Sequence, residues 1–228
     1  MDLSSLQEKI GLKFNNPDLL QQALVHRSYL NENPDFYLDH NERLEFLGDA
    51  VLELVITEYL YRNYPNPEGE LTNWRAALVN AKMLSEIAKR LDLNDFLLLS
   101  RGEAKDTGRA RQYILANAFE ALIGAIYLDQ GYQSAEKFIL KEVVRELPRI
   151  LKEKLYRDPK SRFQEEAQDR VGITPTYEVL KEWGPDHAKH FVVGVYLEKE
   201  LVAQGEGSSK QEAQEKAAQE GLKVKRWE

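Results

Sequence analysis

Four acidic residues recur at helical spacing within an otherwise apolar stretch, residues 41–55. They are Glu42, Glu45, Asp49 and Glu53. At about 100° of rotation per residue, they fall within an arc of roughly 80° on one helix face. The residues around them are almost all apolar, and a helix that is apolar nearly all round is normally buried. Buried carboxylates without partners are very costly, so we expect a cation opposite them.

Two interpretations of this acidic face are open. It is either a solvated stripe on an amphipathic helix or a metal site. The apolar surroundings and the lack of Lys or Arg four residues along the helix favour the metal site. Arg43 alone cannot neutralise four acids. Hard oxygen ligands without Cys or His indicate Mg²⁺, with Mn²⁺ as a possible substitute, rather than zinc.

A second apolar helix, predicted over residues 113–128, also carries an acid. Asn117, Glu120 and Gly124 lie within about 60° of one another on this helix. The small residues beside Glu120 would allow another helix to pack closely. If the two helices pack, Glu45, Asp49, Asn117 and Glu120 would converge as oxygen ligands. Because Asn117 is neutral, this set carries one charge fewer than four acids would.

The elements that must position these residues are predicted to be helical through the first two thirds of the chain. We expect helices over residues 4–30 (two short helices, the second ending at 26–29), 41–61, 71–91, 113–128 and 134–154, the last interrupted by Pro148. Asn41 is a plausible N-cap for the helix that carries the acids. A basic cluster at residues 101–111 is either a solvated loop or a phosphate-facing segment.

After residues 157–160 the hydrophobic pattern changes to a period of two. A helix is predicted over 161–170, strands over 176–182, 190–198 and 201–204, and a last helix from Ser209, which forms a capping box with Glu212. The predicted fold class is an all-α domain (residues 1–155) followed by a small α+β domain (residues 158–228). The second domain has the order α-β-β-β-α and a three-stranded antiparallel sheet.

The second domain carries candidate nucleic-acid contacts. Lys210, in the first turn of the last helix, opposes the helix dipole, and with Ser208 and Ser209 it would make a phosphate cradle. A tolerated surface lysine is the alternative. In the loop 184–190, His187 and Lys189 could donate into a shallow groove, and a His187/His190 metal pair is a weaker alternative.

Three side chains on the first helix of this domain could reach base edges or 2′-hydroxyl groups. They are Gln164, Glu165 and Gln168. Polar surface residues usually do neither, so an ordinary solvated helix face is the alternative.

The composition narrows the class of protein. The 228 residues carry a net charge of −7, which argues against a generally basic nucleic-acid binder and requires local binding patches. There is no cysteine, which excludes disulfides and thiolate zinc sites. No apolar window reaches the ~18 residues of a membrane span, and the first residues do not resemble a secretory signal. We therefore expect a soluble, cytoplasmic protein without membrane contacts.

Three motifs resemble those of the bacterial ribonuclease III family, in the family's order and at similar spacing. They are residues 41–51 (NERLEFLGDAV), 26–29 (HRSY) and 116–125 (ANAFEALIGA). The tail, from residue 158 through Lys210, resembles a double-stranded-RNA-binding domain. The resemblance covers nearly the whole chain, and its central motif is highly specific.

The resemblance implies a homodimeric endoribonuclease that cuts both strands of double-stranded RNA, with one site per subunit. The expected products have 5′-phosphates, 3′-hydroxyls and short 3′ overhangs, and the expected role is in rRNA and other RNA processing. Carried over by position, Glu45, Asp49 and Glu120 hold magnesium, with Asp49 and Glu120 most closely tied to catalysis. The metal would activate a water for in-line attack on phosphorus and stabilise the charge on the phosphate oxygens.

Two further residues take roles from the resemblance. Phe46 matches the aromatic residue that enters the partner subunit, although a core Phe fits the sequence equally well. Glu70, in the loop after the acid-bearing helix, matches a residue that touches RNA near the cut.

The sequence also departs from the family pattern. Asn117 stands where the family usually has Asp, but its amide oxygen can still ligate a metal. Ser208 and Gln211 stand where lysines are common, which should weaken the phosphate clamp. The main rival function is a non-catalytic binder of double-stranded RNA, supported by Asn117 alone. A helical metal phosphohydrolase acting on nucleotides would leave the C-terminal α-β-β-β-α unit unexplained.

Overall fold

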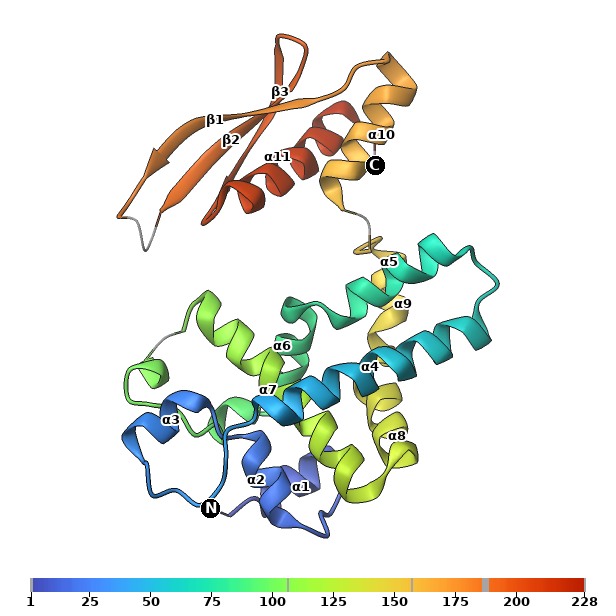
Figure 1. Cartoon of the computed structure of the whole chain (residues 1–228). Coiled ribbons are helices and arrows are strands. Elements are labelled where there is room, and N and C mark those ends of the chain that lie inside the picture. The colour runs from blue at the N-terminus through green and yellow to red at the C-terminus, as the bar shows by residue number, and fades with distance from the viewer. Residues whose placement is uncertain (1, 106, 157, 186–188, 228) are drawn as a thin grey trace. The chain divides into compact units, whose positions relative to one another are not determined.

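The structure is a computed structural model that describes residues 2–105, 107–156, 158–185 and 189–227 (Figure 1). The chain divides into two compact units, Met1–Tyr156 and Arg157–Glu228. Within the described part of the chain, no helix is both long and apolar enough to cross a membrane.

The first unit is helical. Its helices are α1 (Ser4–Ile10), α2 (Pro17–Ala23), α3 (Arg27–Glu32), α4 (Glu42–Asn63), α5 (Glu68–Val79), α6 (Ala81–Arg90), α7 (Arg109–Gln130), α8 (Tyr132–Glu142) and α9 (Leu147–Lys152), with short 3₁₀ turns η1 (Leu93–Asp95), η2 (Glu103–Lys105) and η3 (Val144–Glu146). The longest two, α4 and α7, carry the predicted metal ligands.

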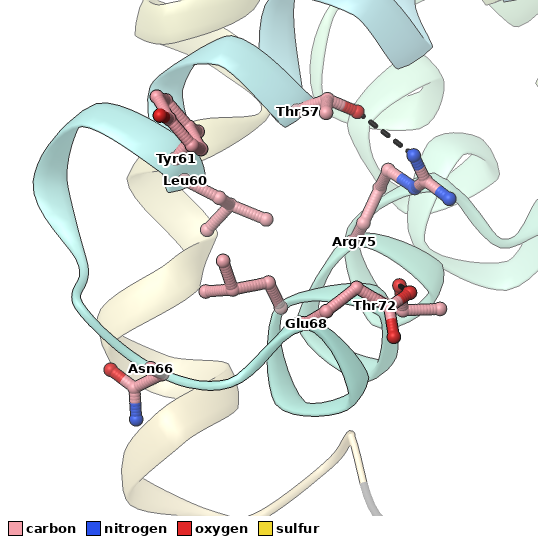
Figure 2. Close-up of a pocket in the computed structure, with 8 residues that line it drawn as sticks. Thr57, Leu60, Tyr61, Asn66, Glu68, Thr72 and Arg75 are labelled. Carbon is pink, nitrogen blue, oxygen red and sulfur yellow. Dashed lines mark hydrogen bonds between the residues drawn. The ribbon is translucent and has the colours of Figure 1, made fainter.

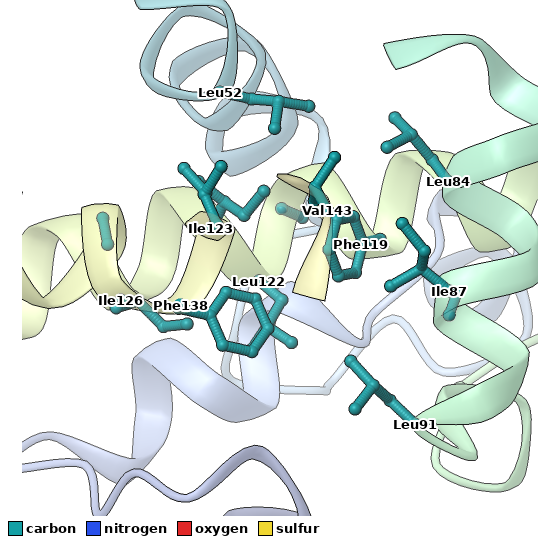
Figure 3. Packing of buried hydrophobic residues seen from close by; sticks show 14 of the residues in the cluster. Leu52, Leu84, Ile87, Leu91, Phe119, Leu122, Ile123, Ile126, Phe138 and Val143 are labelled. Atoms are coloured by element: carbon teal, nitrogen blue, oxygen red, sulfur yellow. The ribbon is translucent and has the colours of Figure 1, made fainter. Parts of the chain in front are cut away.

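Helix α7 lies at the centre of the core of this unit. Figure 3 shows Phe119 and Leu122 of α7 among side chains from its neighbours, including Leu52 of α4, Ile87 of α6 and Phe138 of α8. Burying a large apolar side chain contributes about 1.5–3 kcal/mol. The sequence of α7 is apolar nearly all round, and the helix is accordingly covered on several sides, as predicted.

The N-terminal region contains three helices, so the prediction of two over residues 4–30 was wrong. His26 does not end a helix. It is the N-cap of α3, and its Nδ1 accepts a hydrogen bond from the backbone N–H of Ser28 at 3.3 Å. An imidazole is an uncommon cap acceptor, and the predicted boundary was therefore misplaced.

The helix predicted over residues 71–91 is two helices, α5 and α6. They meet at Asn80, whose extended backbone (ψ 152°) ends α5, and whose Oδ1 accepts from the N–H of Met83 to cap α6. The apolar spacing continues across this break, which hid it. Glu70 consequently lies in the first turn of α5, not in a loop.

The last helical segment breaks at Val143, before Pro148. Pro148 stands in the first turn of α9, where its missing N–H is not needed, so it starts a helix instead of interrupting one.

The second unit has the order α10 (Pro159–Val171), β1 (Thr176–Trp183), β2 (His190–Leu197), β3 (Glu200–Gly207) and α11 (Lys210–Lys225). The strands form an antiparallel sheet in the order β1-β2-β3. Figure 1 shows both helices on one face of this sheet. The alternating β2 residues Phe191, Val193, Val195 and Leu197 are buried. The predicted fold class is confirmed.

Strand β3 extends three residues beyond its predicted end at Gln204. A Cβ at Gly205 would overlap the backbone of α11 at Ala213 and Ala217. The glycine therefore belongs to the strand and allows α11 to pack closely on the sheet.

Candidate active site

The two acid-bearing helices touch backbone to backbone. A Cβ at Gly48 of α4 would overlap the carbonyl of Glu120 in α7, and a Cβ at Gly124 would overlap the carbonyl of Leu44. Only glycine fits both positions. The crossing places the turns that carry Glu45 and Asp49 directly beside the turn that carries Glu120.

Glu120 is the most perturbed acid of the group. Burial raises its pKa to about 8, with further contributions from the negative charges of Asp49 and Glu45. The pKa of Glu45 is also raised, by burial and then by Glu42 and Asp49. Glu45 and Glu120 are half-buried, whereas Asp49 is exposed. Three acids from two helices therefore sense one another's charge at the crossing.

Asn117 lies one turn before Glu120 on α7 and contacts the same group. A side-chain hydrogen bond between Asn117 and Glu45 offsets part of the increase in the pKa of Glu45. An Asp at this position would be a fourth negative charge and could not donate this bond when ionised.

The two outer acids of α4 have cationic partners. Arg27 lies 3.3 Å from Glu42, and Arg75 lies 3.5 Å from Glu53. Among the described residues, Glu45, Asp49 and Glu120 form no ion pair with Lys, Arg or His. The expectation of a cation opposite the acids is therefore met by arginine side chains for the two outer acids only. The three inner acids need a cation from another source.

The inner carboxylates suit a divalent ion by chemistry. Carboxylate and amide oxygens are the ligands of Mg²⁺ and Mn²⁺. Burial, and then the neighbouring negative charges, raises the pKa of Glu45 and Glu120, and a bound cation would favour their ionised forms. In the part of the chain that the structure describes, no three His, Asp or Glu side chains are arranged so that they could hold one metal ion. Convergence of these side chains on one ion therefore stays a prediction.

Helix α4 also has an apolar face that the single chain leaves exposed. Phe46, Leu54 and Tyr61 are 82%, 57% and 80% exposed, which contradicts the expectation that α4 is apolar because it is buried on all sides. With the intervening Ala50 and Thr57 they form the α4 stripe, spaced at three or four residues along one face. So large an exposed apolar surface indicates an interaction site.

A pocket adjoins the C-terminal end of this stripe, between α4 and α5 (Figure 2). Its volume is about 410 Å³, and Leu60, Tyr61 and Leu71 supply its apolar wall. Arg75 at its edge donates to Thr57 Oγ1 at 2.9 Å.

Glu70 is remote from the acids of its own chain. Its carboxylate accepts from Asn66 Nδ2 at 2.8 Å, on the surface beyond the C-terminal end of α4. Fourteen residues of helix separate Asp49 from the end of α4, which is roughly 20 Å at 1.5 Å per residue.

The predicted RNA contacts in the second unit are on its surface. Gln164, Glu165 and Gln168 are exposed on α10, and Gln168 Oε1 accepts from Thr174 Oγ1 at 3.2 Å. His187 lies outside the described residues. His190 stacks on Trp183, with ring centroids 5.6 Å apart.

The predicted phosphate cradle is partly engaged by the chain itself. Ser209 caps α11 by accepting from the N–H of Glu212, as predicted. Ser208 donates both its N–H and its hydroxyl to the carboxylate of Glu212, at 2.8 and 2.7 Å. Hydrogen bonds from Lys216 and Ser208 lower the pKa of Glu212 to about 2. Lys210 is exposed, with Nζ 5.7 Å from the ring centroid of Phe191.

Sequence reasoning missed Gly48 as a site residue. A glycine inside a helix costs about 1 kcal/mol relative to alanine, so its presence calls for a packing reason. The glycine directly before Asp49 in a predicted helix was such a signal. The small residues beside Glu120, Gly124 among them, were predicted to allow close helix packing, and this is confirmed.

Comparison with known proteins identifies two family models along the chain. Residues 16–147 match the model described as Ribonuclease-III-like, and residues 159–225 match the double-stranded RNA binding motif. Both units are therefore accounted for by a described family.

Curated relatives match over nearly the whole length. Ribonuclease 3 of a Nitratiruptor species is 43% identical over 223 residues, which cover 97% of this chain and 96% of the relative. Ribonuclease 3 of Natranaerobius thermophilus is 48% identical over 218 residues, 95% of this chain and 94% of the relative.

Solved structures match the first unit. A structure of the nuclease domain of ribonuclease III from Campylobacter jejuni aligns with a TM-score of 0.58 and 40% identity. It covers 64% of this chain and 99% of that one, and it is described as showing structural flexibility in a region involved in dimer formation.

Proposed function

The chain belongs to the ribonuclease III family as a double-strand-specific, metal-dependent endoribonuclease, and we propose that Mg²⁺ is its metal and that it cuts both strands. The proposed products carry 5′-phosphates, 3′-hydroxyls and short 3′ overhangs. We assign cleavage and dimerisation to Met1–Tyr156 and duplex binding to Arg157–Glu228. The observation that carries the proposal is the grouping of Glu45, Asp49 and Glu120 at the crossing of α4 and α7, where burial, and then the charges of Asp49 and Glu45, raises the pKa of Glu120 to about 8.

The carboxylates of this cluster have distinct proposed roles. Glu45, Asp49 and Glu120 would hold the ion, with Asn117 as a neutral fourth oxygen ligand. Bound Mg²⁺ supplies Lewis-acid activation of the attacking water and stabilisation of charge on the phosphate oxygens. Asp49 and Glu120 are the proposed catalytic pair, placed by the crossing at Gly48. In the overall hydrolysis, a water oxygen bonds to phosphorus and the bond to the 3′-oxygen breaks.

We further propose a homodimer formed through the α4 stripe, with Phe46 inserted into the partner subunit. The exposure of Phe46, Leu54 and Tyr61 supports this proposal. A two-fold axis would place the C-terminal end of one α4 against the N-terminal end of the other. Glu70 lies beyond the C-terminal end of α4, which is roughly 20 Å from Asp49 along that helix, and it would then approach the acids of a second subunit and touch RNA near the cut.

The proposed duplex contacts are the exposed α10 side chains Gln164, Glu165 and Gln168, together with His187 and with Ser209 and Lys210 at the start of α11. Domains of this kind read duplex shape over ~16 base pairs. We place the protein in the cytoplasm, acting on precursor rRNA and other structured transcripts.

The test is incubation of the protein with a long RNA duplex and Mg²⁺, with Glu120→Gln as the matched variant. We expect wild-type cleavage to vanish in Glu120→Gln while duplex binding survives in a gel-shift assay. Wild-type binding without cleavage would instead establish a non-catalytic binder. Loss of binding in Glu120→Gln would point to misfolding, which circular dichroism would detect.

A further inference from the structure

Asn41 is a buried polar residue at the start of the helix that carries the acids. It is 3% exposed. It was expected to cap α4, but its side chain makes no cap hydrogen bond. Its Nδ2 instead donates to the carbonyl of Ala23, the last residue of α2, at 3.1 Å.

This bond is one of three that pair the carbonyl groups of residues 23–25, at the end of α2 and directly after it. Helix ends leave their last carbonyls without partners inside the helix. Ala23, Leu24 and Val25 are all fully buried. The backbone N–H of Leu98 donates to the carbonyl of Leu24 at 2.9 Å. Asn41 donates to the other two carbonyls: its Nδ2 to that of Ala23, and its backbone N–H to that of Val25 at 2.9 Å. Unpaired buried carbonyls are costly, so these bonds hold Asn41 in one place.

Asn41 in turn fixes the first turn of α4. Its carbonyl accepts from the N–H of Glu45 at 2.9 Å. A continuous path of hydrogen bonds thus runs from the buried end of α2 through Asn41 to the backbone of a proposed metal ligand.

The N-terminal part of α4 is fixed at three places. One is the junction at Asn41, and the other two are the contacts of Leu44 with Gly124 and of Gly48 with the carbonyl of Glu120. Without the Nδ2 bond to Ala23, Asn41 keeps only its main-chain bonds, and the turn before Leu44 is held less firmly. We expect the carboxylate of Glu45, the next residue, to shift relative to Glu120.

We infer that Asn41 is a positioning residue for the metal-binding carboxylates, acting through its bond to Ala23; this inference rests on the proposed function. Groups that orient metal ligands without touching the metal typically contribute about 10- to 100-fold to metal affinity. We therefore expect Asn41→Ala to raise the Kd for Mn²⁺ at least about tenfold in protein that remains folded.

The test is an electron paramagnetic resonance titration of the full-length, RNA-free protein with Mn²⁺, well below the melting temperature. Asn41→Ser serves as the second variant should Asn41→Ala not fold. Asn63→Ala is the matched control, because Asn63 Nδ2 also donates to a backbone carbonyl, that of Tyr59 at 2.8 Å, but at the exposed far end of the same helix. Ile150→Ala, in the buried face of α9, controls for lost stability.

The expected pattern is a weakened Mn²⁺ affinity in the Asn41 variant alone, with faster amide hydrogen exchange over residues 42–47. An unchanged Kd in a folded Asn41 variant would overturn the inference, and so would an equal loss in Ile150→Ala. A wild-type protein that binds no Mn²⁺ would overturn the proposed metal site itself, and the inference with it.

Discussion

Gly48 of α4 lies directly against the backbone carbonyl of Glu120 in α7, with no room for a side chain between them. Gly48→Ala should therefore separate the helices, which costs packing in the core as well as the arrangement of the acids. We expect destabilisation by about 1–3 kcal/mol, as for overpacked cores, and a large loss of cleavage.

Gly69→Ala in α5 is the matched control for this change, because a Cβ at Gly69 would meet nothing within 4 Å and the backbone there is helical. Alanine there should be neutral or stabilising by up to about 1 kcal/mol. Chemical denaturation measures both variants. Equal stability of the two would contradict the close contact at Gly48.

The raised pKa of Glu120 predicts how stability changes with pH in the metal-free protein. Its pKa is about 8 in the fold and near 4.5 when unfolded. Between these values the folded state binds the proton more tightly, so stability is full below pH 4.5 and is lost as the pH rises through about 8. Melting temperatures measured in EDTA from pH 5 to 9 should fall accordingly.

Glu120→Gln should flatten this pH dependence, because the amide does not titrate. It should also melt higher than the wild type at pH 9 without metal. Parallel curves for the two proteins would show that Glu120 does not carry the effect.

Asn117→Asp should keep or raise the cleavage rate at saturating Mg²⁺, since it restores the oxygen ligand that is usual in the family. The same change adds a like charge and removes the hydrogen bond to Glu45. We therefore expect lower stability in EDTA at pH 8 but not in Mg²⁺. Single-turnover cleavage and thermal melts measure the two effects, and a clear fall in rate would refute this account of position 117.

Phe46→Asp should separate the proposed dimer. Each buried Phe contributes about 1.5–3 kcal/mol, and two-fold symmetry doubles the loss. The dimer dissociation constant should therefore rise by at least about a hundredfold, as measured by sedimentation equilibrium. Leu128→Asp, at a 53% exposed position of α7, is the control and should stay dimeric. A Phe46→Asp protein that remains dimeric would place the interface elsewhere.

Lys210→Ala should weaken duplex binding similarly for all sequences and lower the slope of log K against log salt by about one unit. Lys223→Ala, at the other end of α11 and paired with Glu220 at 2.7 Å, should leave the slope unchanged. Filter binding between 50 and 200 mM salt separates the two.

The periodicity of the sequence predicted those features of the fold that depend on the burial of apolar faces. The helical first unit, the α-β-β-β-α order of the second and the association of α4 with α7 all follow from the spacing of residues such as Leu52 and Val193. The helix boundaries that were predicted wrongly are those set by single polar side chains. Asn80 splits one predicted helix, and the His26 imidazole starts another, without changing the apolar pattern.

The candidate site was predictable only in part for a related reason. Spacing predicted that Glu45, Asp49 and Glu120 lie on facing sides of two helices, and the structure shows that these two helices pack at Gly48 and Gly124. It could not reveal that Asn41 uses its amide on a distant carbonyl, because Ala23 is eighteen residues away. Nor could it show that Ser208 is engaged by Glu212 and not left free for a phosphate.

The glycine crossing has one more consequence. Main-chain atoms, not side chains, set the gap between α4 and α7 at Gly48 and Gly124. We therefore expect conservative substitutions among the core residues behind them, such as Leu52 or Ile123, to leave that gap unchanged, whereas any side chain at Gly48 or Gly124 should widen it. The spacing of the acid-bearing turns thus depends more on these two glycines than on the composition of the hydrophobic core.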